Sequence, residues 1–176
     1  MTDPETTGRF AGRVAEYARW RPGYPPELLA LLREELGLKP GDVVADVGSG
    51  TGLLSRLFRE NGHPVLAVEP DPEMRRVAEE ELGGVPGFRS VAGRAEETNL
   101  EAGSVDLVVA GQAFHWFDRD AAREEFRRIL REPRRVALVW YTRVVGAGPF
   151  MEALERLLLE HGTDYRSVRH DRIPGG

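Results

Sequence analysis

The stretch that decides the fold is VVADVGSGTG, residues 43–52. Its first half, residues 43–47, is apolar except for Asp46 and shows no alternation, which is typical of a strand covered on both faces. A loop with three glycines follows at once, and apolar residues at helical spacing begin with Leu53. The stretch therefore predicts a strand, a glycine-rich loop and a helix in direct succession.

Strand-like and helix-like patterns alternate along the rest of the chain. A helix is expected from Pro26 with Gly37 as its C-terminal stop, and a short amphipathic helix is expected around residues 10–17. Strands that alternate with helices form βαβ units, so we predict a doubly wound α/β fold, with a mostly parallel sheet and helices on both faces. The further elements expected are strands at 64–68, 88–91, 105–110 and 135–140. The further helices expected run from 53 to an end at 61–62, from 72 to 82, over 121–130 and over 150–158.

The composition limits the class of partner. The chain has 176 residues, with 24 basic and 29 acidic ones, and a formal net charge of −5. This length predicts one domain with a core of its own. The charge provides no electrostatic footprint for duplex nucleic acid or for an anionic membrane. We therefore expect neither a nucleic acid nor a membrane as a partner.

The cysteine content and the apolar segments of the sequence indicate which sites and which cellular compartment to expect. The absence of cysteine excludes a disulfide scaffold, a thiol nucleophile and a cysteine-based metal site, and we expect no metal. The first ten residues lack the basic and apolar regions of a signal peptide, and no apolar run approaches the roughly 20 residues that span a bilayer. These features predict a cytoplasmic protein. Lys39 is the only lysine and Gln112 the only glutamine, a bias that fits either a thermophile or a GC-rich genome.

The glycine loop and one acidic residue mark the expected ligand site. Ligands bind open α/β sheets outside the carboxyl ends of the strands, where this loop is expected to lie. Its spacing is GxGxG, with Leu53 in place of the third glycine of a dinucleotide fingerprint, and no P-loop lysine follows. Glu69 ends the second strand 19 residues after Gly48, where a carboxylate is expected to accept from a ribose diol. A glycine turn without a ligand and a solvated strand end are the alternatives, whereas Asp71 is expected to cap a helix and Asp106 to brace its strand.

Five motifs occur in order along the chain: VADVGSGTG (44–52), EP (69–70), GRAE (93–96), SVDLV (104–108) and QAFHWF (112–117). Together they resemble the successive motifs of class I S-adenosylmethionine-dependent methyltransferases. The group they resemble most is the type-11-like small-molecule enzymes, similar to ubiquinone/menaquinone-biosynthesis and trans-aconitate methyltransferases. The resemblance runs from about residue 10 to residue 140, and it implies S-adenosyl-L-methionine as the cofactor and a small molecule as the methyl acceptor.

The resemblance also implies which residues contact the cofactor. In this family the glycine loop approaches the methionine part, the carboxylate after strand two binds the ribose, and the segments after strands three and four border the adenine and the reacting sulfur. Arg94 departs from the pattern, since the family often has aspartate there. The positions that match are Asp46, Gly48, Gly50 and Gly52 for the methionine part, Glu69 for the ribose, Pro70, Ala95 and Glu96 for the adenine, Gln112 beside the sulfur, and Tyr17 in the N-terminal segment.

The catalytic residue stays open. His115 lies between Phe114 and Trp116, where it is either a general base that titrates near neutral pH or part of a packed aromatic corner. A sulfonium cofactor carries its own leaving group, so alignment of the reactants is the main demand and no nucleophile is needed. Within the single domain, we expect residues 1–37 to form a helical segment or lid, 41–141 the cofactor-binding core, and 146–176 an incomplete C-terminal part.

The chain departs from the family at its C-terminal end. The family's sheet ends with an antiparallel hairpin beyond strand five, and no β-rich run after residue 140 supplies one. Strand 135–140 is therefore expected to be an exposed apolar edge. We favour a piece of a longer protein, and the alternative is a homodimer in which a second subunit covers that edge. Two other functions stay open, an NAD-dependent oxidoreductase and a noncatalytic cofactor-binding or interaction module.

Overall fold

The computed structural model describes residues 21–141 and 147–162. The chain divides into two compact units, Met1–Val139 and Trp140–Gly176, and each is described by itself. The helix expected around residues 10–17, with Tyr17, lies outside the described residues. The division of a single domain into lid, core and incomplete C-terminal part therefore stays a prediction.

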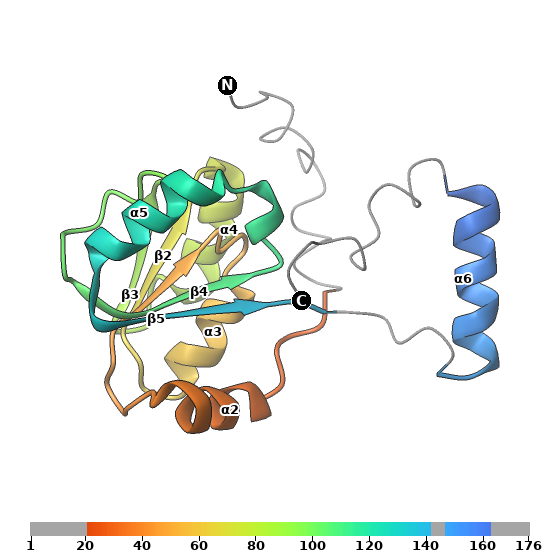
Figure 1. Ribbon diagram of the computed structural model, residues 1–176, viewed down its shortest axis with the longest axis horizontal. Helices are drawn as coiled ribbons and strands as arrows, with labels where there is room; N and C mark the ends of the chain where they lie inside the picture. The colour runs from red at the N-terminus through yellow and green to blue at the C-terminus, as the bar shows by residue number, and fades with distance from the viewer. Residues whose placement is uncertain (1–20, 142–146, 163–176) are drawn as a thin grey trace. The chain divides into compact units, whose positions relative to one another are not determined.

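The first unit contains a parallel five-stranded sheet with helices on both faces, which confirms the predicted fold class (Figure 1). Its strands are β1 (Val44–Val47), β2 (Val65–Glu69), β3 (Phe88–Ala92), β4 (Val105–Gly111) and β5 (Leu130–Val139). Its helices are α2 (Glu27–Leu36), α3 (Leu53–Glu60), α4 (Pro72–Leu82), the single 3₁₀ turn η1 (Phe114–Trp116) and α5 (Arg119–Ile129). The strand order is β3-β2-β1-β4-β5, so the direction of winding reverses between β1 and β4. Ligands bind at such a reversal in open α/β sheets.

The residues of β1 alternate between two hydrophobic cores. Ala45 and Val47 belong to the core under α5, and Val44 belongs to the core under α2 and α3 on the opposite face (Figure 1). All four residues of β1 are buried, as expected for a central strand of a parallel sheet. Because side chains alternate across a strand, Asp46 shares the α3 face with Val44.

The helix ends follow the local signals in the sequence. Gly37 ends α2 in the left-handed conformation, with a φ of 64°. Asp71 caps α4, since its carboxylate accepts from the amides of Glu73 at 2.8 Å and Met74 at 3.3 Å. Both agree with the predictions. The cap on α4 matters for the site because it fixes the turn directly after β2.

The predicted bounds of β5 and α5 differ from the observed ones. The sequence predicts the strand at 135–140, but β5 already begins at Leu130, and it predicts the helix at 121–130, but α5 begins two residues earlier, at Arg119. β5 begins at Leu130, which pairs with Val105, and the ladder resumes with Arg135 opposite Leu107. Residues 131–134 thus lie opposite the single residue Asp106, so β5 has three extra residues there and the ladder is irregular. Pro133 lies within it, and a proline inside a run argues against a strand when only the sequence is known. In the described sheet β5 is an edge strand, with Val136 38% and Leu138 40% exposed.

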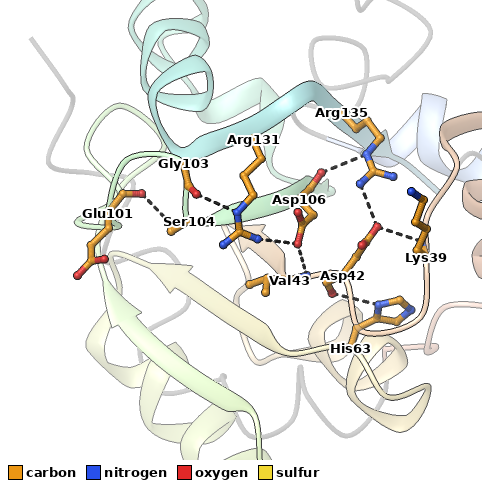
Figure 2. Close-up of polar contacts among 10 residues, drawn as sticks. All are labelled: Lys39, Asp42, Val43, His63, Glu101, Gly103, Ser104, Asp106, Arg131 and Arg135. Atoms are coloured by element: carbon orange, nitrogen blue, oxygen red, sulfur yellow. Dashed lines mark hydrogen bonds and ion pairs between the residues drawn. The ribbon is translucent and has the colours of Figure 1, made fainter.

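A network of charged side chains joins the amino ends of β1, β4 and β5 (Figure 2). The Asp106 carboxylate accepts from the Val43 amide at 2.8 Å and from Arg131 at 2.9 Å, so it braces the entry to β4 as predicted. Burial alone raises the pKa of Asp106, but these two donors, together with the positive charges of Arg131 and Arg135, outweigh it and hold that pKa below its usual value. Arg135 donates to the Asp42 carboxylate at 2.9 Å and to the Asp106 carbonyl at 3.2 Å. The network lies at the opposite end of the strands from the glycine loop.

The second unit contains helix α6 (Pro149–His161), with Pro149 in its first turn and Gly162 after its end. This agrees with the helix predicted over 150–158. Phe150 is 76% and Leu157 55% exposed. None of the helices in the described ranges is long and apolar enough to cross a membrane.

Candidate active site

The glycine loop is tied to β2, the neighbouring strand. The amides of Gly48 and Ser49 both donate to the Val68 carbonyl, at 2.9 and 3.1 Å. The amide of Gly50 donates to the Glu69 carboxylate at 2.9 Å. The loop after β1 and the carboxylate after β2, which the sequence predicts for one ligand, are therefore in direct contact.

The three loop glycines differ in what a side chain at each position would contact. A Cβ added to Gly48 would lie 2.5 Å from the Ala113 Cβ, so this glycine allows the loop to pack against the segment after β4. A Cβ added to Gly52 would lie 3.0 Å from Leu82 on α4. Gly50, with a φ of 55°, has no atom within 4 Å of such a Cβ and faces open space. Of the three, Gly50 is the one whose missing side chain leaves room for a ligand.

Glu69 is held by its backbone surroundings. Its side chain is 9% exposed, and its second carboxyl oxygen accepts from the Asp71 amide at 3.0 Å. Arg75 of α4 donates to the carbonyls of Glu69 and Pro70, at 2.8 Å each, and so fixes the turn. Burial raises the pKa of Glu69, although the amides of Asp71 and Gly50 oppose it. Each oxygen uses one of its two acceptor sites on an amide, so the carboxylate can still accept a diol.

Asp46 is the most deeply buried carboxyl of the site. Its side chain is 1% exposed, and the Ser55 hydroxyl of α3 donates to its Oδ2 at 2.7 Å. Burial raises the pKa of Asp46 to about 7; Ser55 lowers it in part and the like charge of Glu69 adds to the rise. A carboxyl in this state is poised to change protonation near neutral pH when a charged ligand arrives.

Polar atoms without hydrogen-bond partners gather at the carboxyl ends of β1 and β4. Among the described residues they include Oδ1 of Asp46, Oγ1 of Thr51 in the glycine loop, and Nε2 of Gln112 directly after β4. Gln112 also has a φ of 58°, a conformation that non-glycine residues rarely adopt and that is common at functional sites. Buried polar groups are normally satisfied. These three atoms fit a polar ligand at this edge of the sheet.

The residues predicted to border an adenine ring lie after β2 and β3. Pro70 is exposed, whereas Ala95 is 4% exposed. The carboxylate of Glu96 accepts from the Asp118 amide at 2.8 Å and is therefore engaged with the start of α5. Arg94 forms a loose ion pair with Glu96 at 3.7 Å. The Glu96 carboxylate keeps acceptor sites beyond the Asp118 amide, so both it and the backbone remain for a contact with a ligand edge.

His115 lies on η1 and is exposed, beside Trp116 at a ring-centroid distance of 4.6 Å. Next to it, Phe114, Phe117 and Phe126 form an aromatic cluster, whose rings meet edge to face at 5.8 and 6.3 Å. The His115 ring contacts Trp116, and its interpretation as part of a packed aromatic corner stays a prediction. Its role as a general base stays a prediction.

Sequence reasoning missed three residues near this edge. Ser55 is fully buried on the inward face of α3 among leucines, and a serine at such a position is the signal that could have found it. Arg75 shows no local signal, because its carbonyl partners lie in the turn before its helix. Tyr24 places its hydroxyl where a Cβ on Gly111 would lie 2.3 Å away, at the end of β4. That contact joins residues 87 positions apart and leaves no trace in either local sequence.

Comparison with known proteins names the family. A family model described as "Methyltransferase domain" matches residues 45–137, from β1 to β5. This range holds the glycine loop, Glu69 and Gln112, the parts that the structure brings to one edge of the sheet. The chain belongs to the type-11-like class I methyltransferases. The resemblance seen in the five motifs is thereby confirmed.

The relatives of this methyltransferase domain are longer proteins. It is 41% identical over 134 residues to an uncharacterized methyltransferase of Mycobacterium tuberculosis, covering 76% of this chain and 52% of that protein. It is 32% identical over 150 residues to an uncharacterized methyltransferase of Schizosaccharomyces pombe, covering 85% of this chain and 58% of that protein. A solved structure of a proposed type II methyltransferase from Anaeromyxobacter dehalogenans has a TM-score of 0.65 at 34% identity, covering 84% of this chain and 59% of that one. This chain thus spans about half the length of the curated relatives it matches.

Proposed function

We propose that this methyltransferase domain binds S-adenosyl-L-methionine at the carboxyl ends of β1, β2 and β4 and directs its methyl group to a small-molecule acceptor. The observation that carries the proposal is a pair of buried carboxyls beside the glycine loop. Asp46 and Glu69 lie at the ends of adjacent parallel strands, and Glu69 holds the loop at Gly50. Carboxylates accept from hydroxyl and ammonium groups, which the ribose and the amino-acid part of this cofactor offer.

The nucleoside end of the cofactor is assigned to the turn after β2. We assign the ribose hydroxyls to Glu69, whose carboxyl oxygens keep acceptor sites beyond the two amides they serve. Pro70 is exposed next to it and offers an apolar surface for the adenine ring. We assign the adenine edge to Ala95 and Glu96, whose carboxylate keeps acceptor sites beyond the Asp118 amide.

The amino-acid end is assigned to the reversal point between β1 and β4. Gly48 and Gly52 shape the loop by close packing, and Gly50 leaves the space that the ligand needs. The unpartnered oxygen of Asp46 and the unpartnered amide nitrogen of Gln112 are the polar groups that we expect to face this end. Tyr17, the last of the predicted contacts, lies outside the described residues.

Methyl transfer from this cofactor requires the protein mainly to bind and align the reactants. When bound, the cofactor supplies an electrophilic methyl group on a sulfonium that is also the leaving group. The residues of this chain then have to orient the reactants and exclude water, and proximity and orientation can contribute about 7–11 kcal/mol to lowering such a barrier. No residue has to act as a nucleophile, and His115 as a general base is the secondary hypothesis.

The acceptor class is inferred from the resemblance to the small-molecule subgroup of the family, and the charge agrees with it. We propose a small molecule on that resemblance, and a formal net charge of −5 disfavours a large polyanion as the substrate. A cytoplasmic location and a homodimer, in which a second copy covers β5, stay predictions.

Titration calorimetry with two ligands tests the proposal. We expect S-adenosylhomocysteine, the product form of the cofactor, to bind and NADH not to bind. Glu69→Ala is expected to weaken the binding, and the matched control Glu73→Ala, at an exposed position in the first turn of α4, is expected to leave it unchanged. Binding of NADH alone would contradict the assignment and favour an oxidoreductase. Binding of S-adenosylhomocysteine without methyl transfer by the whole protein to any acceptor would leave a noncatalytic module.

A further inference from the structure

One oxygen of the Asp46 carboxyl group accepts a hydrogen bond, and the other has no hydrogen-bond partner among the described residues. The Ser55 hydroxyl donates to Oδ2 at 2.7 Å, and Ser55 itself is fully buried. Oδ1 is buried and has no partner among the described residues. A hydroxyl that occupies one oxygen fixes the rotation of the carboxyl group and so determines where the other oxygen points.

The surroundings of Asp46 do not compensate a negative charge. From β2 the acidic Glu69 acts on it, and from α3 the uncharged Ser55 does; its neighbours on β4 are apolar. Arg75 acts on Glu69 and is engaged with backbone carbonyls. Within the described ranges, therefore, no cationic side chain forms an ion pair with Asp46. A buried carboxylate without a counter-ion is costly, and a cationic ligand would remove that cost.

We propose that Ser55 is a positioning residue, whose hydrogen bond to Oδ2 presents Oδ1 of Asp46 to a protonated amine of the ligand and so makes the site selective for ligands that carry one. The proposal rests on the proposed function, since it concerns how the same site recognises its nucleoside ligand. Asp46 touches the ligand, and Ser55 acts through Asp46. The same arrangement couples binding to proton release, because a carboxyl protonated in the ligand-free protein gives up its proton when an ammonium group arrives.

Burial supports this coupling, because it raises the pKa of Asp46 to about 7 and leaves the group partly protonated at neutral pH. The Ser55 hydroxyl lowers that pKa by favouring the carboxylate, and the Ser55 backbone, which Ser55→Ala retains, lowers it less. Removing the hydroxyl therefore raises the pKa further. The variant protein should bind an ammonium ligand more weakly, and the deficit should be largest at low pH, where less of its carboxyl is ionised.

The experiment compares two ligands, one of which lacks the whole amino-acid part, its ammonium group and its carboxylate. S-adenosylhomocysteine carries the ammonium group, and 5′-methylthioadenosine keeps the nucleoside and the sulfur without it. Calorimetry on the full chain and on Ser55→Ala, at pH 6, 7 and 8, measures both affinities. Repeating the titration in two buffers of different ionisation enthalpy gives the number of protons released. Ser55→Thr keeps a hydroxyl and serves as the rescue variant, and Asp46→Asn removes the group through which Ser55 acts.

We expect Ser55→Ala to lower the affinity for S-adenosylhomocysteine about tenfold at pH 6, with a smaller deficit at pH 8, and to leave that for methylthioadenosine within about twofold. Ser55→Thr should restore the selectivity, and Ser55→Ala should have no added effect in the Asp46→Asn background. An equal loss for both ligands, or a deficit that does not change with pH, would overturn the proposal and make Ser55 merely structural. Should Ser55→Ala fail to fold, retained selectivity in Asp46→Asn overturns it as well. If the unmodified chain binds neither ligand at any pH, the proposed function fails first, and that outcome is distinct from lost selectivity.

Discussion

Replacing Glu125 by glutamine tests how the segment after β3 is tied to α5. The carboxylate accepts from both the amide and the hydroxyl of Thr98, at 2.8 and 2.5 Å, and from Arg128 at 2.6 and 2.7 Å. Arg128 in turn donates to the Leu100 carbonyl at 2.8 Å. Glu125 is 9% exposed and Thr98 is fully buried. One carboxylate thus satisfies two buried donors in the connection that leads from the candidate site to β4.

The pKa of Glu125 gives the size of the effect. The hydrogen bond from Arg128, helped by the two Thr98 donors and opposed by burial, lowers that pKa from 4.5 to about 2. At ~1.4 kcal/mol per pKa unit this corresponds to about 3 kcal/mol of stability. The Arg128 side chain is 43% exposed, so solvent screening reduces the expected loss to roughly 2 kcal/mol. Because the folded-state pKa is depressed, the contribution is fully present above pH 4.5 and is lost as the pH falls from 4.5 toward 2.

Urea unfolding followed by circular dichroism measures the loss. We expect Glu125→Gln to lower the free energy of unfolding by roughly 2 kcal/mol at pH 7, and the difference from the unmodified protein to shrink between pH 4.5 and pH 3. Glu124→Gln is the matched control, because Glu124 is the neighbour on α5 and pairs with Arg127 at 3.0 Å but is 70% exposed. Its loss should stay below about 1 kcal/mol. Equal losses in the two variants, or a Glu125→Gln deficit that persists unchanged at pH 3, would refute the reasoning.

Three further predictions concern the site. Glu69→Ala should weaken S-adenosylhomocysteine binding by roughly 1.5–3 kcal/mol in calorimetry while circular dichroism shows an intact fold, and an unchanged affinity would remove Glu69 from the site. Gly50→Val should abolish binding, because its side chain would point into the open space beside the loop, at a φ of 55° that valine rarely adopts; normal binding would mean that the loop does not cradle the ligand. His115→Asn should keep much of the methyl-transfer rate of the whole protein, whereas loss of a general base would lower it roughly 10²–10⁴-fold and remove an acid limb from the pH profile.

The local sequence was sufficient to predict features that depend only on residues close together in the chain, such as helix ends. The left-handed Gly37 and the Asp71 cap follow from residue types that stabilise helix ends, and they lie where the sequence predicts them. The contact between Gly50 and Glu69 could be predicted from the fold class, because parallel strands bring their carboxyl ends to one edge of the sheet.

Long-range contacts set the limit of sequence reasoning. The pairing of Glu125 with Thr98 joins residues 27 positions apart, and neither local sequence indicates the other. The early start of β5 could not be predicted because Pro133 lies inside the irregular part of the ladder. Ser55 was visible as a polar residue on an apolar helix face, but only the fold shows that its partner is Asp46. The methyl acceptor leaves no motif in the chain at all.

A crystal structure with S-adenosylhomocysteine tests the central proposal most directly. We expect the ribose hydroxyls on the Glu69 carboxylate, the amino group toward Oδ1 of Asp46, and the ligand passing over Gly50. A ligand bound elsewhere, such as in the apolar groove that Phe126, Val136 and Leu138 help to line, would contradict the assignment, as would a ribose out of reach of Glu69.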